Sequence, residues 1–581
     1  MNRIQHLNHY NRPYVWFFSL FFVFALLKVL SPLASSIMFD AVPPSQSKSA
    51  PTLNSCTLPI SNLPATLDPR KASDATSGLI LRHIYEGLTR LSKDNIGELA
   101  LASECKISSD RKTYTFKLKE SYWNNGVRLV AQDFVNSWAS ILDPSFPSPN
   151  AYHLFCIEGA QAVHERTLSP KHFGAKALDP SILEITLKEP NASFLEILAF
   201  DVFYPVYIPD PSNQHISHST RHVSNGPFSL ISSLEFGKDI VLKKNPHFWN
   251  HTEVSLDKLH FCKIQDPTTA LELFRRGELD WVGNPLLPIP IEVQLHSLNM
   301  DEHSLSDPLH LPISYIGGAF SYWITLNCET APFKAKEIRQ AMAACLESID
   351  FSLALGSIRE KSHSPLPNFL RPARHSKTAQ THQQEPSDPK KLFMQGCQKL
   401  KITPEQLPHL TYIYNPTDIH HLVAQVVKEQ IEKQLPIKVV LQSMEWQSLQ
   451  KELKMGSYIM ARNGWRAQIP DPLNILEIFQ SEEPTLQPYM HNFSRWSHPD
   501  YDKLLTEIGS LPNGKAKDTK VEKACSILAE ELPVIPLFFD PLVYYKNPAL
   551  NNVQLTELGR IDFSKAFFNQ NADKNPDQSD F

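Results

Sequence analysis

The sequence predicts a mixed α/β fold, and three patterns of apolar residues support this prediction. Residues 113–118 alternate between polar and apolar side chains, which indicates a strand with one buried face. Residues 133–142 place apolar side chains at helical spacing behind an aspartate and end before Pro144, as in an amphipathic helix. Residues 409–441 combine a strand, a helix and a second strand, an order that favours a βαβ unit.

The predicted βαβ unit belongs to an α/β region in the second half of the chain. Residues 409–414 are typical of a strand, and an aspartate opens the apolar helical stripe at residues 418–431. A β-branched run at residues 437–441 indicates the second strand, parallel to the first. A strand at residues 325–327 and a helix at residues 335–346 are predicted to start the same region.

Size and composition restrict the class of protein. At roughly 100–200 residues per domain, a chain of 581 residues predicts three or four domains or lobes. Its 56 basic and 61 acidic residues give a formal charge of −5, which argues against nucleic acid as a partner. Only 19 glycines against 46 prolines exclude collagen-like and Gly-rich repeat architectures and predict many turns.

Residues 1–36 are predicted to direct export. Arg3 and Arg12 precede an apolar run at residues 14–27, and small residues follow, as in a secretory signal peptide. A retained membrane anchor is the alternative, because the apolar stretch nearly reaches the ~20 residues of a spanning helix. Lys28 interrupts that stretch and favours cleavage.

Two further segments lack any periodicity. Residues 37–54 are rich in Ser and Pro and are interpreted as a linker. Residues 569–581 are polar and are interpreted as a flexible tail. No internal repeat is visible between them.

The eight cysteines form no Cys-x-x-Cys pair, so a zinc ribbon or a redox dithiol is not indicated. An exported chain can form disulfides, but buried free thiols are equally compatible with the sequence. The cysteines are Cys56, Cys105, Cys156, Cys262, Cys328, Cys345, Cys397 and Cys525.

Catalytic motifs are missing from the sequence. It contains no G-x-S-x-G, no G-x-x-x-x-G-K-[ST] and no H-E-x-x-H. His215, His218 and His222 have the spacing of metal ligands, but the Pro, Ser and Asn residues around them indicate a solvated loop. His420 and His421 are adjacent and would face different directions on a helix. We therefore expect a protein without catalytic residues, metal or cofactor.

Several short motifs follow one another in a fixed order along the chain. This series resembles the oligopeptide-binding family, the solute-binding components of peptide ABC transporters (extracellular solute-binding proteins, family 5), over about residues 55–565. The motifs include Ile84-Tyr85-Glu86-Gly87-Leu88, Trp123-Asn124-Asn125-Gly126, Ser224-Asn225-Gly226-Pro227-Phe228, Ala461-Arg462-Asn463-Gly464-Trp465 and Tyr501-Asp502-Lys503-Leu504.

The same motifs also have a purely structural interpretation. The sequence Asn225-Gly226-Pro227 is typical of a turn. Trp123, Trp138 and Trp249 are expected to be core aromatic residues. Most of these residues are therefore predicted to maintain the fold.

The resemblance implies a periplasmic-binding-protein-like α/β fold, with two lobes joined by a hinge and an extra inserted domain. Lobe I would be discontinuous, over residues 55–88, 222–318 and 531–568. Lobe II would be the insertion at residues 89–221, and lobe III would span residues 319–530. Such a protein would close over an extended peptide, which adds backbone hydrogen bonds to strand edges in the cleft.

The resemblance also implies where the peptide binds. In the family the cleft uses an Ala-Arg-x-Gly-Trp segment, which here contains Arg462, Gly464 and Trp465. Arg462 matches a basic residue that pairs with the carboxylate of a short peptide, as suits a guanidinium fork. Trp446 and Trp465 match aromatic residues near the peptide, with ordinary core packing as the alternative for each. Asn225 completes this part of the predicted ligand-binding set.

The sequence departs from the family where the peptide's amino group would bind. Family members place an aspartate three residues after the tryptophan, to hold the α-ammonium, and here that position is Gln468. Losing a desolvated charge pair costs about 2–5 kcal/mol of affinity. Asp471 matches another acidic position and would compensate only if the loop near Pro470 is displaced. Both Gln468 and Asp471 are therefore included in the predicted site.

The resemblance implies a binding protein rather than an enzyme. Its partners would be a peptide and the permease and ATPase subunits of an ABC importer, and we expect a monomer in the periplasm. A retained N-terminal anchor would instead tether it to the inner membrane. The alternatives are a non-standard solute (a cell-wall muropeptide, a glutathione-like peptide or a metal chelate) and an envelope adhesion or chaperone role.

Overall fold

The computed structural model describes residues 54–209, 222–231, 239–290, 293–294, 313–372, 388–482 and 491–569. The predicted signal peptide or anchor and nearly all of the predicted linker and tail lie outside these residues. His215 and His218 of the predicted histidine loop also lie outside them. Within the described residues, none of the helices has the length and apolar character needed to cross a bilayer.

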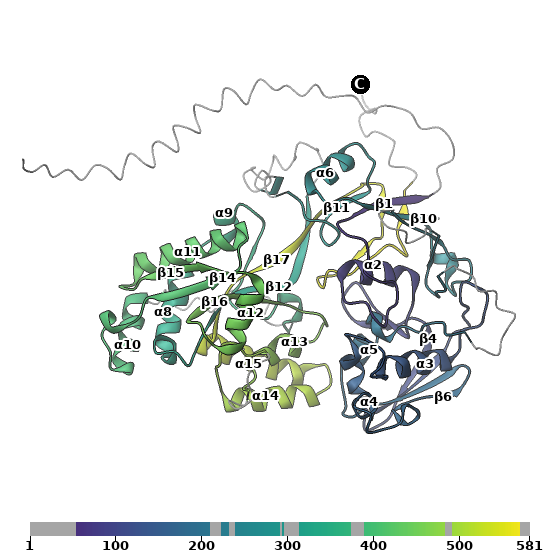
Figure 1. Cartoon of the computed structure of the whole chain (residues 1–581), viewed down its shortest axis with the longest axis horizontal. Coiled ribbons are helices and arrows are strands. Elements are labelled where there is room, and N and C mark those ends of the chain that lie inside the picture. Colours follow the sequence, from purple (N-terminus) through teal and green to yellow (C-terminus); the bar gives the residue numbers. More distant parts are fainter. Residues whose placement is uncertain are drawn as a thin grey trace, which may run out of the picture. The chain divides into compact units, whose positions relative to one another are not determined.

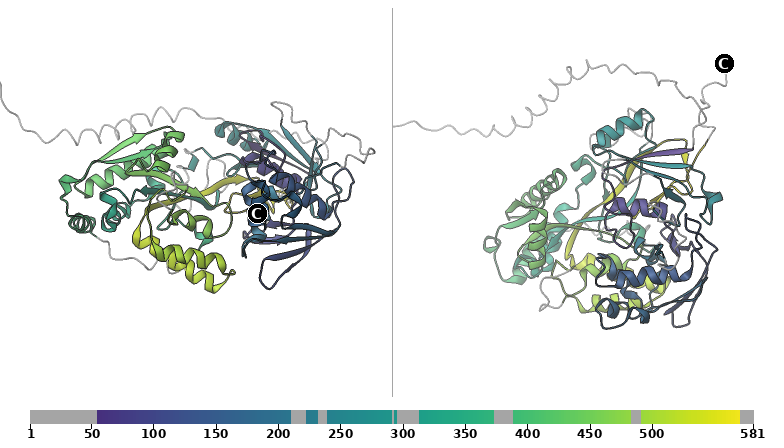
Figure 2. Two further views of the ribbon diagram at one scale, coloured as in Figure 1. Left: turned by 60° about the horizontal axis from the view of Figure 1, so that its bottom comes forward. Right: turned by 45° about the vertical axis from the view of Figure 1, so that its right-hand side comes forward.

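Two strands of 13 residues, β12 (Ser314–Leu326) and β17 (Val534–Lys546), lie side by side in antiparallel pairing (Figures 1 and 2). Their register shifts between Ile316 and Phe320. Gly318 lies at this bulge, where an added Cβ would come within 1.6 Å of a backbone oxygen of β17. Only glycine therefore permits so close an approach of the two backbones.

These two strands form the middle of a seven-stranded sheet with the order β11-β17-β12-β16-β14-β15, and β13 pairs with β17 off this path. β14 and β15 are parallel and are joined through helix α11, which confirms the predicted βαβ unit. The further strands are β11 (Trp281–Gly283), β13 (Glu360–Lys361), β14 (Leu410–Tyr414), β15 (Val439–Ser443) and β16 (Met460–Arg466).

Two four-stranded sheets belong to the first half of the chain. One has the order β1-β10-β9-β8 and the other the order β4-β5-β7-β6. The first comprises β1 (Ser55–Ile60), β8 (Phe228–Leu230), β9 (Ile240–Lys244) and β10 (Lys258–Lys263). The second comprises β4 (Ala102–Ile107), β5 (Thr113–Leu118), β6 (Ala175–Asp179) and β7 (Ile182–Thr186). The two-stranded pairs are β2 (Thr89–Leu91) with β3 (Gly97–Leu99), β18 (Leu550–Asn551) with β21 (Phe567–Phe568), and β19 (Gln554–Leu555) with β20 (Ile561–Asp562).

Helices accompany the sheets along the whole described chain (Figure 1). In the first half they are α2 (Ala75–Ile84), α3 (Ala131–Leu142), α4 (Ala160–His164), α5 (Phe194–Ile197) and α6 (Pro267–Arg275). In the second half they are α8 (Lys336–Leu346), α9 (Phe351–Leu355), α10 (Pro389–Leu400), α11 (Asp418–Gln434), α12 (Trp446–Met455), α13 (Leu473–Leu476), α14 (Pro499–Ser510) and α15 (Lys515–Glu531).

Helix α2 connects the two ends of the described chain. Its N-cap Asp74 accepts a hydrogen bond from the backbone N–H of Ser77 at 2.8 Å, which satisfies a free donor of the first turn. His83, fully buried near its C-terminus, has Nδ1 2.8 Å from the carbonyl of Leu79. Its Nε2 accepts the backbone N–H of Phe563 at 3.1 Å. This one imidazole therefore fixes the C-terminal segment to a helix 480 residues earlier.

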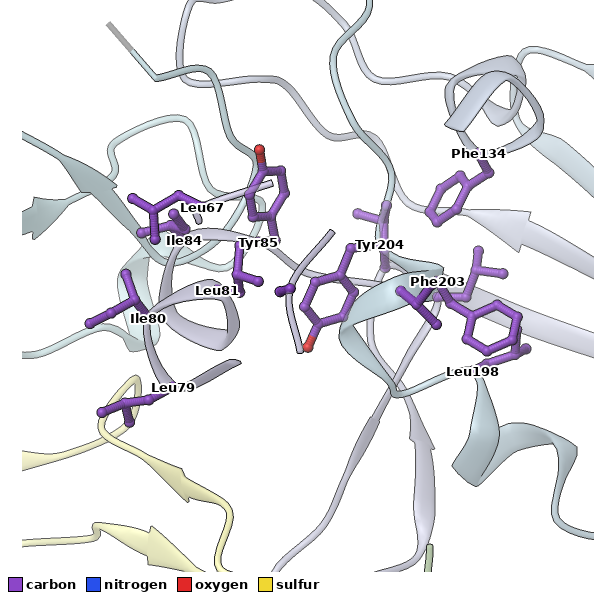
Figure 3. Packing of buried hydrophobic residues seen from close by; sticks show 14 of the residues in the cluster. Leu67, Leu79, Ile80, Leu81, Ile84, Tyr85, Phe134, Leu198, Phe203 and Tyr204 are labelled. Carbon is purple, nitrogen blue, oxygen red and sulfur yellow. The ribbon is translucent and has the colours of Figure 1, made fainter. Parts of the chain in front are cut away.

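The largest buried cluster runs without a break from α2 into the residues around β4–β7. Figure 3 shows the side chains of α2 on one side, Phe134 and Phe203 on the other, and Tyr85 and Tyr204 between them. The rings of Tyr85 and Tyr204 stack with their centroids 6.4 Å apart. Separate clusters lie along the seven-stranded sheet, one of them with the helices α8, α10 and α11.

Most of the predicted elements are confirmed. The strand at Thr113–Leu118 and the helices Ala131–Leu142 and Lys336–Leu346 lie where the patterns place them. Trp123 and Trp138 are fully buried, as expected for core aromatic residues.

Trp249 is only half-buried, which differs from the expected core position. Its indole N–H donates to Glu86 at 2.6 Å, and the ammonium group of Lys119 lies 3.5 Å from the centre of one of its rings. These polar partners satisfy the indole N–H and cover a face of the ring.

The turn residue Gly226 packs directly on the end of α2. An added Cβ would lie 2.4 Å from the carbonyl carbon of Ile84. We therefore expect Gly226→Ala to lower the free energy of unfolding by about 1–3 kcal/mol, because neither backbone can move away freely. Gly509→Ala in α14 is the matched control: its nearest neighbour is 3.7 Å away, and alanine favours a helix. Thermal unfolding of the two variants measures the difference, and equal melting temperatures would contradict this packing.

Candidate functional site

Strand β16 carries the predicted ligand-binding segment, and one of its edges is only partly paired. β12 pairs with β16 along its whole length, from Met460 to Arg466. On the other edge β14 pairs only with Met460 and Ala461. Among the described residues, no strand pairs with the remainder of that edge. The segment after Ala461 can therefore accept another extended chain as an added strand.

Arg462 is a buried cation without a carboxylate partner. Its side chain is 9% exposed, and its Nε is buried and makes no hydrogen bond. The guanidinium carbon lies 5.1 Å from the ring centre of Tyr322 and 5.9 Å from those of Phe320 and Trp446. No carboxylate of the described residues lies within ion-pair distance of it. Since a desolvated charge is costly without a counter-charge, this position favours an anionic ligand.

The groups around Arg462 are neutral at physiological pH. Nδ1 of His420 lies 3.2 Å from the hydroxyl of Tyr322. Burial and the charge of Arg462 lower the pKa of His420 to about 3. Burial also raises the pKa of Tyr322 to about 12. Arg462 is therefore the charged member of what we call the Arg462 pocket, formed by Phe320, Tyr322, His420, Trp446 and Arg462.

Gly464 and Trp465 follow Arg462 on β16. A Cβ on Gly464 would come within 2.6 Å of the carbonyl of Ser321 and 2.7 Å of the ring of Phe320, so this glycine lets β16 pack closely on β12. The indole N–H of Trp465 is buried and makes no hydrogen bond. Its ring lies edge-on to His491, with centroids 6.0 Å apart. Trp465 therefore combines core packing with an unused hydrogen-bond donor.

Trp446 is the first residue of α12 and is 46% exposed, so much of its ring is free for contact. Gln468 is exposed just after β16, and its backbone N–H donates to the side chain of Asn474 at 2.7 Å. Both residues thus lie at the surface. Trp446 is close to Arg462 in space, and Gln468 follows Arg462 along the chain.

Asp471 is buried and already paired. One of its oxygens accepts from the ammonium group of Lys517 at 2.9 Å and from the hydroxyl of Ser193. The other accepts the backbone N–H of Leu473 at 2.9 Å. The charge of Asp471 is therefore compensated within the protein, which argues against its replacing a carboxylate at Gln468.

The side chain of Asn225 binds the protein backbone and not an open site. Its side chain accepts from the backbone N–H of Glu86 at 3.1 Å and donates to the carbonyl of the same residue at 2.9 Å. It is fully buried, and both of its polar atoms are engaged. The structure thus places Trp446 beside Arg462, while Trp465, three residues after Arg462 on β16, lies on the opposite face of the sheet, and Asn225 lies elsewhere.

A separate small hollow of about 70 Å³, open to solvent, lies between α2 and the β19–β20 hairpin. Two of its arginines pair with carboxylates of the protein, Arg82 with Asp201 at 3.6 Å and Arg90 with Glu86 at 3.6 Å, whereas Arg560 donates to the carbonyl of Ala199 at 3.1 Å.

The histidine and cysteine predictions can be compared with the structure in part. His222 lies 3.1 Å from the hydroxyl of Tyr85, and burial lowers its pKa. His420 and His421 bond to different tyrosines, which agrees with their expected divergence. All eight cysteines are free thiols, which answers the question that the sequence left open.

Sequence reasoning missed the contributions of Phe320, Tyr322 and His420 to the pocket. These residues lie about 40 to 140 positions away from Arg462 along the chain, and only the pairing of β12 with β16 brings the first two close. The one available signal was in β12, where polar and aromatic residues alternate before the buried end of the strand and so indicate two different faces.

Residues 98–486 match the family described as bacterial extracellular solute-binding proteins, family 5. The chain is 29% identical to the oligopeptide-binding protein OppA of Bacillus subtilis over 537 residues, which cover 90% of this chain and 93% of that one. It is 26% identical to the periplasmic murein peptide-binding protein MppA of Escherichia coli, over 82% of this chain and 86% of that one.

Solved structures show the same fold. The unliganded open form of the murein tripeptide-binding protein MppA matches with a TM-score of 0.75 and 22% identity, over 89% of this chain and 97% of that one. Listeria monocytogenes OppA bound to peptide matches with a TM-score of 0.62 and 22% identity, over 89% and 99%. The family match covers more than half of the sequence, and the shared fold extends over most of the chain. The chain belongs to family 5 of the bacterial extracellular solute-binding proteins.

Proposed function

We propose that this protein captures peptides and delivers them to an ABC importer. The family and the names of its relatives support this function. The observation that carries it is Arg462, a buried guanidinium without a carboxylate partner, beside an unpaired strand edge. A peptide supplies both missing partners, since it has a terminal carboxylate and a backbone able to form strand hydrogen bonds.

The proposed binding mode follows from the free edge of β16 and from the position of Arg462 on that strand. The peptide lies extended along the edge that β14 leaves free after Ala461. Its carboxylate enters the Arg462 pocket, where low exposure to water strengthens the ion pair. Trp446 and Trp465 contact its side chains. Gln468 lies beyond the strand end, and Asp471 is already bound to Lys517, so the amino group is held without a carboxylate at either position.

We further propose that β12 and β17 connect the lobes. The lobes keep the expected ranges: lobe I at residues 55–88, 222–318 and 531–568, lobe II at 89–221 and lobe III at 319–530. The bulge at Gly318 supports the boundary at residues 318 and 319, because a register shift weakens the ladder locally. Closure about these strands would favour the ligand-bound form.

The remaining parts of the proposal concern the setting of the protein. It acts as a monomeric binding protein without catalysis or cofactor, in the periplasm, with the permease and ATPase subunits of a transporter as partners. Export through the N-terminal segment supports this location, with tethering by a retained anchor as the alternative. The membership of the chain in a family of extracellular solute-binding proteins agrees with export.

Mass spectrometry of ligands released from the natively purified protein tests the proposed function. We expect co-purified peptides, with the amino termini showing whether a free amine is required. Release of a bound non-peptide solute, or conversion of added peptides into products, would contradict it.

The charge of Arg462 should determine the preference for a free carboxylate. We expect Arg462→Ala to weaken binding of a tripeptide by about 2–5 kcal/mol, while the melting temperature of the free protein does not fall. Isothermal titration with trialanine and its C-terminal amide measures the effect. The wild type should prefer the acid, whereas the variant should bind acid and amide alike. Arg276→Ala, at the exposed C-cap of α6, is the control, and an unchanged preference in Arg462→Ala would remove Arg462 from the site.

His420 should report on the charge of Arg462 by NMR. Burial and, to a smaller extent, the nearby guanidinium lower the pKa of His420 to about 3, so Arg462→Ala should raise this pKa. Because the folded-state pKa lies below the unfolded value of about 6.5, the stability from neutral His420 is complete above that pH. It is lost as the pH falls towards 3. His420→Gln assigns the resonance, and an unmoved pKa would show that Arg462 does not act on this ring.

Gln468 should limit the affinity for ordinary peptides. If it occupies the position facing the amino group, Gln468→Asp restores an opposite charge and should tighten the binding of trialanine. Acetylated trialanine should gain nothing. Gln395→Asp, on exposed α10, controls for the added charge. Equal gains for the free and acetylated peptides would show that the amino group binds elsewhere.

A further inference from the structure

Three metal-ligating side chains meet on the sheet β1-β10-β9-β8, far in sequence from the Arg462 pocket. Asp239 immediately precedes β9, while His260 and Cys262 lie two residues apart on β10 and therefore share one face of the strand. The opposite face of β10 carries the buried residues Leu259 and Phe261. The three side chains are partly exposed, so an ion from solvent can reach them.

The ligand atoms converge on one point. Nε2 of His260 lies 2.9 Å from Oδ2 of Asp239, and the sulfur of Cys262 lies 3.6 Å from Nε2 and 3.8 Å from Nδ1. All three ligand atoms lie within 4.8 Å of one another. A tetrahedral zinc site with Zn–S near 2.3 Å and Zn–N near 2.1 Å separates sulfur from nitrogen by about 3.6 Å. The observed sulfur–nitrogen spacing therefore already suits a shared ion, and the carboxylate oxygen needs to move by only about 0.5 Å.

The contacts fit ligation better than a catalytic relay. In a relay the imidazole uses one nitrogen for the carboxylate and the other for the nucleophile. Here Nε2 faces Asp239, and the sulfur of Cys262 is almost equally far from the two ring nitrogens, so no separate nitrogen serves the thiol. A thiol, an imidazole nitrogen and a carboxylate that face one point form a donor set typical of Zn²⁺.

The backbone holds the three ligands in place. β10 pairs with β1 on one side and with β9 on the other, with His260 opposite Thr57 and Val241. The second oxygen of Asp239 accepts the backbone N–H of Lys263 at 3.2 Å. This contact orients the carboxylate and leaves Oδ2 directed at His260, as the outer-shell partners of metal ligands do.

We propose that Asp239, His260 and Cys262 bind one divalent transition-metal ion of the zinc class, with a water molecule as the fourth ligand. The ion would bind outside the proposed peptide site, on a sheet that Arg462 does not contact. It would join the start of β9 to β10 and stabilise this sheet. The proposal is independent of the peptide-binding function.

Titration of the metal-free, reduced full chain with Co²⁺ tests the site. A cobalt–thiolate bond absorbs in the near ultraviolet, so we expect a band that saturates at one equivalent and disappears when Zn²⁺ displaces the cobalt. Cys262→Ser should abolish the band, and His260→Gln should weaken binding at least tenfold. Cys105→Ser, a half-buried cysteine on β4, should leave the band intact.

A second measurement avoids dependence on a single variant. Zn²⁺ should raise the melting temperature of the wild type and of Cys105→Ser, but not that of Cys262→Ser or His260→Gln. If Cys262→Ser fails to fold without metal, His260→Gln takes its place in both measurements. A wild type without a saturable band, or a band of full size in Cys262→Ser, would overturn the proposal.

Discussion

The pairing of β12 with β17 is the interaction on which the sheet in the second half of the chain depends. Each strand contributes 13 residues, and both are buried along most of their length. β16 attaches to β12, β14 attaches to β16, and β11 attaches to β17. The Arg462 pocket exists only because this ladder presents Phe320 and Tyr322 opposite β16. Close approach at Gly318 lets the two backbones stay together through a change of register.

The site is built on an electrostatic imbalance that the fold leaves unresolved. Other buried charges of the described chain have partners of opposite charge: Asp471 has Lys517, and Arg339 has Glu531. Arg462 instead lies among aromatic rings, which offer a cation only a weak attraction. The free protein thus bears the cost of a desolvated guanidinium, which the carboxylate of the proposed peptide ligand would remove. Affinity of this kind would depend on charge and backbone rather than on particular side chains.

The sequence was sufficient for the class of fold, and it indicated the segment of β16 that carries the proposed site. Periodicity predicted the strand at Thr113–Leu118 and the βαβ unit, because local pattern alone determines such elements. Periodicity could not predict that the carboxylate of Asp471 binds Lys517 and Ser193, because Lys517 lies 46 residues later and Ser193 lies 278 residues earlier. It also missed the cluster of Asp239, His260 and Cys262, whose members meet only through the register of two strands.

The continuous core between α2 and the residues around β4–β7 affects how this protein can change over evolution. Tyr85 and Tyr204 stack across it, and Phe134 and Phe203 complete the same interior as Leu81 (Figure 3). A segment that shares its interior with α2 is not an exchangeable module. Deleting it would leave the apolar side of α2 facing water, and a segment taken from a relative would have to pack against α2 in its place. Variation in this part of the chain is therefore restricted to its surface and loops.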